Sequence, residues 1–231
     1  MSWLSSSSIG RKVVMSVTGT CLVLFLLFHA SMNIVAIFDS INHTDGYEII
    51  CEFLGANWYA LVGTVGLAVL VLIHFIYAFW LTFQNRKARG TQRYAVTEKP
   101  STVEWASQNM LVLGIIVIVG LGLHLLNFWS KMQLQELIHG QAVINGQAIA
   151  PTDGAAFIRY TFSQWYYVVL YCIWLAALWF HLSHGFWSAL QTLGWSGKTW
   201  HGRWQVIGNI YVTLLILGFL SVVFLYFFKS L

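Results

Sequence analysis

Residues 179–187 read "WFHLSHGFW", with two histidines, His181 and His184, three positions apart in an otherwise apolar and aromatic stretch. The stretch lies within an uncharged run at about 163–192, which is longer than the roughly 20 residues that an α-helix needs to cross a bilayer. A polar side chain in hydrocarbon is costly and usually faces a bundle interior or a cavity. The stretch therefore predicts a membrane helix whose histidines face the interior of a helix bundle.

The rest of the chain has the same apolar character. Of its 231 residues, 58% are hydrophobic and only 9% are charged, which is too little polar surface to cover a globule in water. Long apolar runs predict five spans, at 13–38, 57–83, 107–129, 163–192 and 204–228. The first run is too long for a signal-peptide core and lacks a clear cleavage site, so we expect a retained helix. We predict an all-α membrane protein, with residues 1–231 forming a single transmembrane domain.

The basic residues indicate how the predicted spans are oriented. Nine of them fall on one side, namely Arg11, Lys12, Arg86, Lys87, Arg89, Arg93, Lys99, Lys198 and Arg203. The other three, Lys131, Arg159 and Lys229, fall on the opposite side. The positive-inside rule then predicts a multi-pass protein with its N-terminus in the cytoplasm. This placement accounts for the net charge of +4, and we expect no nucleic-acid partner. The acidic loop 39–56 faces outward in this orientation, and so does the segment 130–162, whose "NGQAIAPTDG" indicates turn and loop.

Four of the predicted spans contain a histidine near their far end. His43, His139 and His201 fall in predicted loops, where histidines are usually solvated. Counted from the approximate helix starts 13, 57, 107 and 165, His29, His74, His124 and His181 instead lie 16 or 17 residues into successive spans, or roughly 25 Å along each helix. Because successive helices run in opposite directions, His29 and His124 should lie toward the outer side, and His74 and His181 toward the cytoplasm. The spacing predicts two histidine pairs at two depths.

Two imidazoles that face each other across a helix bundle can fill both axial positions of a b-type haem, which favours electron transfer over oxygen binding. The pattern therefore predicts a bundle enclosing two b-type haems. Zinc is a weaker alternative, because it requires about four ligands that converge on one point. Glycines in the spans would let a flat porphyrin approach the backbone, although plain helix packing explains them equally well. They are Gly19, Gly63, Gly66, Gly114, Gly120 and Gly122.

Over nearly its whole length the sequence resembles the single-chain, five-helix, two-haem cytochrome b subunit of succinate:quinone and quinol:fumarate oxidoreductases. The resemblance rests on "SSSIGRKVVMSVTG" before the first span, "FHASMN" around His29, His74 late in the second span, and "HLLNFW" from His124. It rests above all on "HLSHGFWSALQTLGW" from His181. The family's fourth ligand is followed four residues later by glycine, which selects His181, with Gly185, over His184.

The resemblance implies a ligand set and a cofactor content. His29 and His124 would bind the iron of an outer haem, and His74 and His181 that of an inner haem. His184 would contact a haem propionate, water or the backbone.

The resemblance also implies a bacterial cytoplasmic membrane, membrane lipid, and partners on the cytoplasmic side. A flavoprotein subunit would carry the dicarboxylate site of succinate dehydrogenase or fumarate reductase, and an iron–sulfur subunit would connect it to the haems. Menaquinone is the expected quinone. The basic segment 86–93 would meet the iron–sulfur subunit or the inner haem propionates, but ordinary positive-inside charge explains it as well.

A quinone site pairs electron transfer with proton transfer, and the five spans contain no Asp or Glu. Glu48, Glu52 and His43 lie close in sequence to the end of the helix that carries His29, on the side where the family's low-potential quinone binds. We name Glu48 and Glu52 as candidate proton acceptors, with a solvated acidic loop as the alternative. Some family members carry a carboxylate in the fourth helix, whereas the residues around Trp179 are apolar.

Two other classes of function remain open. A cytochrome b anchor of a hydrogenase or formate dehydrogenase would share the paired histidines but should lack "HLSHGFWSALQTLGW". A transporter that relays protons through membrane histidines would bind no haem.

Overall fold

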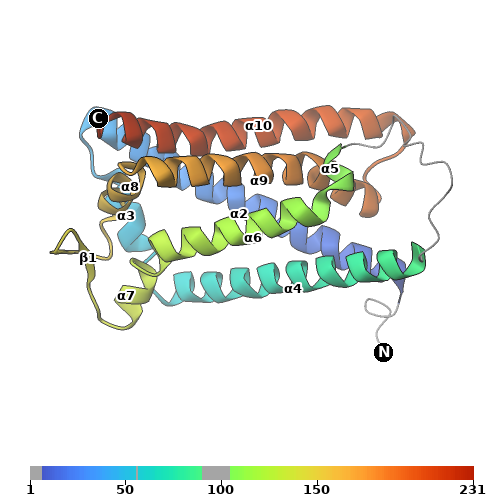
Figure 1. Cartoon of the computed structure of the whole chain (residues 1–231), viewed down its shortest axis with the longest axis horizontal. Helices are drawn as coiled ribbons and strands as arrows, with labels where there is room; N and C mark the ends of the chain where they lie inside the picture. The colour runs from blue at the N-terminus through green and yellow to red at the C-terminus, as the bar shows by residue number, and fades with distance from the viewer. Residues whose placement is uncertain (1–6, 56, 90–104) are drawn as a thin grey trace.

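Five long helices lie side by side in the computed structural model, which describes residues 7–55, 57–89 and 105–231 (Figure 1). They are α2 (Ser8–Asn42), α4 (Trp58–Arg89), α6 (Met110–His124), α9 (Trp165–Thr192) and α10 (Lys198–Phe228). A π-helical turn, η1 (Leu125–Trp129), continues α6. Within the described ranges, five helices are long and apolar enough to cross a membrane. The five predicted spans are thus confirmed.

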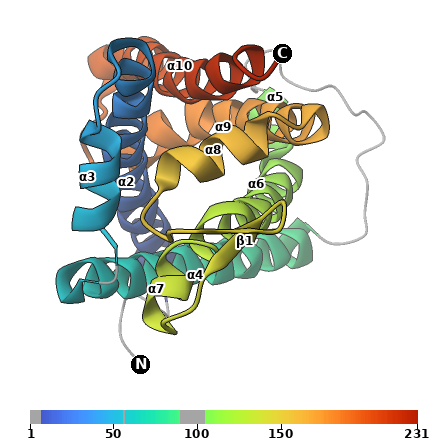
Figure 2. The same ribbon diagram turned by 90° about the vertical axis from the view of Figure 1, so that its left-hand side faces the viewer.

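Helix α2 is central in the bundle, because it packs against α4, α9 and α10, while α6 packs on α9 (Figure 2). The most extensive contact between helices is that of α9 with α10. Leu175 and Leu178 of α9 and Val212, Leu215 and Ile216 of α10 are buried in one core cluster. Lipid tails are as apolar as leucine, so close packing and hydrogen bonds, rather than apolar burial, hold such helices together.

Two tyrosines of α10 supply hydrogen bonds of this kind. The Tyr226 hydroxyl donates to the carbonyl of Ala36 over 3.0 Å. The Tyr211 hydroxyl donates to the carbonyl of Val23 over 3.4 Å. Both acceptors belong to α2, so the last helix is bonded along the length of the first.

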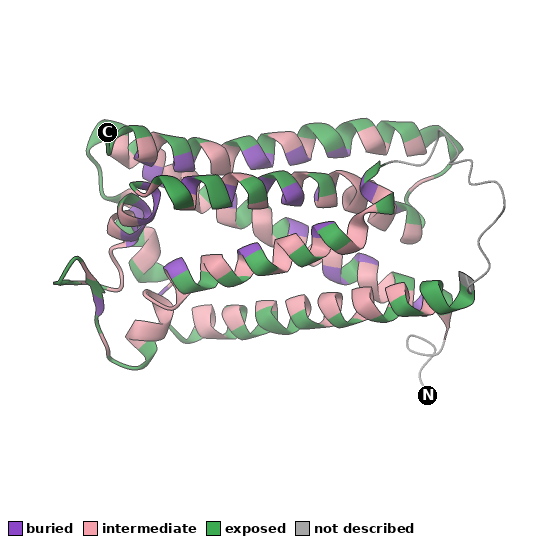
Figure 3. Ribbon diagram, viewed as in Figure 1, coloured by how far each residue is buried: buried purple, intermediate pink, exposed green. Residues whose placement is uncertain are grey.

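Helix α4 is packed much less closely than its neighbours. None of its residues from 58 to 88 is buried, whereas α9 and α10 each carry a row of buried side chains (Figure 3). Its main partner is α2, and it touches α6 only slightly. The helix that carries His74 is therefore attached to the bundle chiefly through α2.

Short elements gather at one end of the bundle, on the left of Figure 1. They are α3 (Gly46–Phe53), α7 (Gln133–Leu137), α8 (Gly154–Phe162) and a hairpin of β1 (Ala142–Ile144) and β2 (Gln147–Ile149). The stretch "NGQAIAPTDG" at 145–154, predicted to be turn and loop, contains the hairpin turn but also strand β2 and the start of α8. Glu48 and Glu52, predicted to lie in a loop, are on helix α3.

Local signals explain these short elements. Asn145 and Gly146 have φ of 51° and 81°, the conformation that a two-residue hairpin turn needs. The Asp153 carboxylate accepts from the Ala156 N–H over 2.8 Å and caps α8.

The opposite end carries most of the described basic residues. Helix α2 begins there with Arg11 and Lys12, α4 ends there beyond Arg86, and α10 begins there with Lys198. The short α5 (Trp105–Gln108) also lies at this end. Arg93, Lys99 and half of the basic segment 86–93 fall outside the described residues. Lys131, Arg159 and Lys229 lie at the far end, so the described charges are segregated as the sequence predicts.

Candidate functional site: two histidine pairs and an outer cavity

His29 of α2 and His124 of α6 face each other inside the bundle. Their ring centroids are 5.7 Å apart and their planes are nearly perpendicular, at 87°. Aromatic rings surround them: Phe219 lies 5.8 Å from His29, and Phe128 and Trp174 lie 5.1 and 5.6 Å from His124. The outer pair predicted from the sequence is therefore brought together in a water-poor aromatic setting.

His74 of α4 and His181 of α9 form the second pair, with ring centroids 6.4 Å apart and planes at 71°. The Thr18 hydroxyl oxygen lies 3.1 Å from His74 Nδ1. A Cβ added at Gly19 would lie 3.3 Å from His74 Cε1, and one at Gly114 would lie 3.9 Å from His181 Cε1. Glycines of α2 and α6 thus lie beside the inner pair.

The remaining glycines of the spans have other surroundings. Gly120 makes room for the indole of Trp174, which is plain helix packing. A Cβ at Gly63, Gly66 or Gly122 would meet nothing within 4 Å. The glycines of the predicted spans therefore did not by themselves indicate a haem site.

The contacts between helices give the depth that separates the two pairs. On α2, Thr18 and Gly19 mark the level of the inner pair, and His29 lies ten residues beyond Gly19. On α6, Gly114 marks the inner level, and His124 again lies ten residues further. At 1.5 Å per residue both helices place the two levels roughly 15 Å apart.

Each pair consists of two imidazole side chains. Among the described residues, no group of three or more His, Cys, Asp or Glu side chains is placed to hold a metal ion. A bare zinc ion needs about four protein ligands, whereas a haem iron, already held by its porphyrin, needs two axial ones. Metal–nitrogen bonds of about 2 Å would place axial ring centroids roughly 6 Å apart, and the distances of 5.7 and 6.4 Å lie on either side of this value.

Hydrogen bonding within the pairs is incomplete. The Nδ1 atoms of His124 and His181 are buried and have no hydrogen-bond partner among the described residues. An unsatisfied buried polar group costs about 1–3 kcal/mol, and ligation of a ring nitrogen is one way to offset that cost. The donor set of each pair therefore fits a haem.

His184 is not part of either pair. Its ring lies 4.9 Å from that of Trp187, which in turn lies 5.0 Å from that of His201. The sequence placed His201 in a loop, but it belongs to the first turn of α10. The histidines at 181 and 184 therefore have different neighbours, as expected if only His181 is a ligand.

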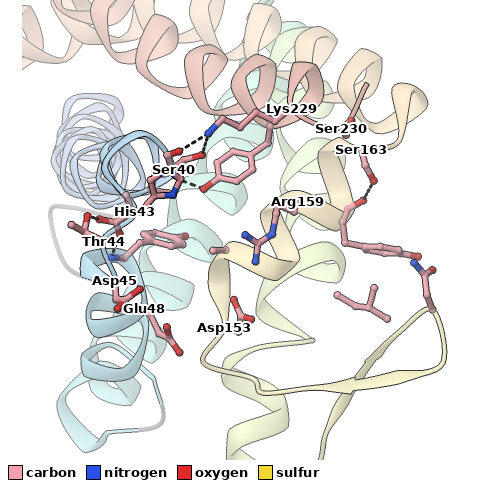
Figure 4. Close-up of a pocket in the computed structure, with 18 residues that line it drawn as sticks. Ser40, His43, Thr44, Asp45, Glu48, Asp153, Arg159, Ser163, Lys229 and Ser230 are labelled. Carbon is pink, nitrogen blue, oxygen red and sulfur yellow. Dashed lines mark hydrogen bonds between the residues drawn. The ribbon is translucent and has the colours of Figure 1, made fainter.

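A cavity of about 870 Å³ opens at the end of the bundle that carries α3 and α8 (Figure 4). It lies among α2, α3, α8 and α10, and charged side chains of both signs line it. They are Asp39, Asp45, Glu48, Asp153, Arg159 and Lys229. Glu48 therefore lines the cavity, whereas Glu52 is exposed and is not among its lining residues.

A partly buried polar chain connects this cavity to the pair of His29 and His124. The hydroxyl of Tyr47, a lining residue, donates to Asn33 Oδ1 over 3.2 Å. Asn33 Nδ2 donates to the His29 carbonyl over 2.8 Å and lies 3.5 Å from His29 Nε2. Burial raises the pKa of Tyr47, so its hydroxyl keeps its proton and remains a donor. Sequence reasoning missed Tyr47, although Asn33 belongs to the "FHASMN" motif.

No protein-family model matches the chain, and no curated protein or solved structure is significantly similar to it. The functional argument therefore rests on the two histidine pairs and on what surrounds them.

Proposed function

We propose that this chain is a di-haem cytochrome b membrane anchor that passes electrons between a membrane quinone and an iron–sulfur subunit of succinate dehydrogenase or quinol:fumarate reductase. The observation that carries the proposal is the presence of two facing imidazole pairs at two depths of one helical bundle. His29 and His124 would hold the outer haem, and His74 and His181 the inner one.

When bound, each haem supplies a one-electron centre whose iron alternates between the ferrous and ferric states. The chain's own contribution is to position and protect these centres. A histidine on each face leaves no axial position for oxygen, which favours electron transfer. The rings of Phe128, Trp174 and Phe219 keep water away from the outer pair.

Proton exchange with the quinone is assigned to the outer cavity. Glu48 would accept a proton from a quinol whose hydroxyl lies within hydrogen-bond reach, a role that typically speeds a step by about 10²–10⁴. The chain of Tyr47 and Asn33 supports this assignment, because it leads from the cavity to His29. Glu52 lies outside the cavity lining, so we now favour Glu48 of the two candidate acceptors.

The remaining parts of the proposal concern the orientation of the chain in the membrane and its binding partners. The end with Arg11, Lys12, Arg86 and Lys198 would face the bacterial cytoplasm, where the iron–sulfur and flavoprotein subunits bind. Menaquinone is the proposed quinone. His184, on the cytoplasmic side of His181, would contact a propionate of the inner haem.

Haem content tests the proposal directly. A pyridine haemochrome assay of the purified chain should give two haems b per polypeptide, and a redox titration should resolve two low-spin centres. One haem or none per chain refutes the proposal, and a proton-relay transporter would give none. Co-purification with succinate:dye activity separates this family from a hydrogenase or formate dehydrogenase anchor.

A further inference from the structure

We infer that Thr18 is a positioning residue that fixes the tautomer of His74, so that Nδ1 carries the proton and Nε2 presents its lone pair to the metal. The consequence for a haem rests on the proposed function, whereas the hydrogen bond itself does not. The starting point is the 3.1 Å contact between Thr18 Oγ1 and His74 Nδ1, which joins α2 to α4.

The direction of this hydrogen bond follows from the other contacts of the hydroxyl. Thr18 Oγ1 lies 2.8 Å from the carbonyl oxygen of Val14 and 3.1 Å from that of Met15. Both carbonyls can only accept, so the single hydroxyl proton points toward the backbone of its own helix. Thr18 therefore has only lone pairs to offer His74.

An acceptor at this position requires a proton on His74 Nδ1. A neutral imidazole carries one ring proton, so Nε2 is then the unprotonated nitrogen. A doubly protonated ring would place a charge within the apolar part of the bundle, which is costly. The Met15 carbonyl is a second acceptor for the His74 ring. Together with it, the Thr18 hydroxyl favours the tautomer in which Nε2 can bind a metal.

The surroundings hold the ring in this position. Thr18 is 5% exposed, so water does not compete for its hydroxyl. At the next residue, a Cβ on Gly19 would lie 3.3 Å from His74 Cε1, so the imidazole lies close against the α2 backbone. His181, the other member of the inner pair, has no partner for Nδ1 in the described part of the chain. The two histidines of the inner pair therefore differ in whether Nδ1 has a hydrogen-bond partner.

A hydrogen bond from Nδ1–H makes an imidazole a stronger electron donor to a bound metal. Stronger donation stabilises the ferric form, so Thr18 should lower the midpoint potential of the inner haem. The outer haem, whose ligands belong to His29 and His124, should not respond.

The test compares Thr18→Val, Thr18→Ser and the matched control Thr20→Val. Thr20 lies two residues further along α2, and within the described ranges its hydroxyl donates only to the Ser16 carbonyl, over 2.8 Å. Redox titration of the purified complex should show a higher potential for the inner haem in Thr18→Val alone, with the outer potential unchanged. Thr18→Ser should retain the wild-type potential, because it retains the acceptor. Loss of the inner haem in Thr18→Val but not in Thr18→Ser also supports the inference.

A second readout does not depend on haem. In chain labelled with ¹⁵N-histidine, the His74 signal, assigned by its absence in His74→Gln, should be that of the Nδ1-protonated tautomer, and Thr18→Val should shift it toward the other tautomer. A wild-type chain without haem would refute the proposed function and leave this measurement intact. An Nε2-protonated His74, equal potentials in wild type and Thr18→Val, or equal haem loss in both Thr18 variants would overturn the inference.

Discussion

Four half-buried imidazoles inside an apolar bundle need a reason, because a leucine would pack there without polar atoms to satisfy. The cost is visible at His124 and His181, whose Nδ1 atoms have no partner among the described residues, at about 1–3 kcal/mol for each unsatisfied group. His29 and His74 each contact a polar side chain, Asn33 and Thr18 respectively. Each pair thus joins one imidazole that contacts a polar side chain to one whose Nδ1 has no partner in the described part of the chain.

Removal of a single histidine should affect one redox centre only. We expect His29→Ala or His124→Ala to remove or loosen the outer haem, and His74→Ala or His181→Ala the inner one, because each low-spin iron needs two axial ligands. Potentiometry of the purified variants measures both centres. His184→Ala should keep both haems and at most shift one potential. If His29→Ala and His74→Ala perturbed the same centre, the assigned pairs would be wrong.

Glu48 and Glu52 should differ in their effect on quinone. Glu48→Gln should slow quinone-linked turnover by about 10²-fold or more, because a carboxamide cannot take up the proton. Glu52→Gln is the matched control on the same helix and should retain turnover, since Glu52 does not line the cavity. Haem content and dicarboxylate activity with artificial dyes should be unchanged in both. Normal quinone turnover in Glu48→Gln would falsify the role of this cavity.

At the scale of elements, α6 changes its winding immediately after His124. The π-helical turn η1 follows that residue directly, and such turns are frequent at functional sites. Two side chains of η1 are bonded to neighbours: Asn127 Nδ2 donates to the Tyr171 hydroxyl over 3.4 Å, and Trp129 Nε1 donates to Gln133 Oε1 over 2.9 Å. The end of the helix that presents His124 is therefore held against α9 and α7.

Close packing of α6 on α9 should depend on Gly120. A Cβ there would overlap the indole of Trp174, which already donates from Nε1 to the Val117 carbonyl over 2.9 Å. We expect Gly120→Ala to lower the free energy of unfolding by about 1–3 kcal/mol, as overpacking does. Gly122→Ala, where nothing lies within 4 Å, should be neutral or stabilising by up to about 1 kcal/mol. Thermal unfolding in detergent compares the two, and equal stability would exclude the steric explanation.

The long elements could be predicted because their signal is repeated over about 20 residues, and the depth of each histidine followed from simple counting. The short outer elements gave much weaker signals. The local sequence signal for helix α8 was its capping residue, Asp153, which was interpreted as part of a turn and loop. Contacts between elements lay beyond the sequence altogether: neither the bond from Tyr47 to Asn33 nor that between Thr18 and His74 follows from local pattern, because each depends on how two helices pack.

At the scale of the whole molecule, the two ends of the described bundle differ in their charges and in their short elements. One end carries the basic starts of α2 and α10, and the other carries α3, α8, the hairpin and the charged cavity (Figures 1 and 4). At this second end Lys229 Nζ donates to the Ser40 hydroxyl over 2.7 Å, which joins α2 to the residue that follows α10.

The charge distribution predicts which end faces the cytoplasm. In a chain with Cys21, Cys51 and Cys172 replaced by serine, Gln147→Cys on the hairpin should react with a membrane-impermeant maleimide on intact cells. Thr199→Cys, in the first turn of α10, should react only after the membrane is permeabilised. Both positions are exposed, so access alone decides the result. The reverse pattern would place the N-terminus outside and contradict the positive-inside assignment.

Under the proposed function, the distribution of an electron between the two histidine levels should depend on the membrane potential. Their separation of roughly 15 Å is about half of the 30 Å hydrocarbon core. An electron that moves from the outer level to the inner one would therefore cross about half of the transmembrane field, which corresponds to about 1 kcal/mol per 100 mV. With the cytoplasm negative, the field would hold the electron on the outer pair, so energised membranes should shift reduction from the His74–His181 level toward the His29–His124 level.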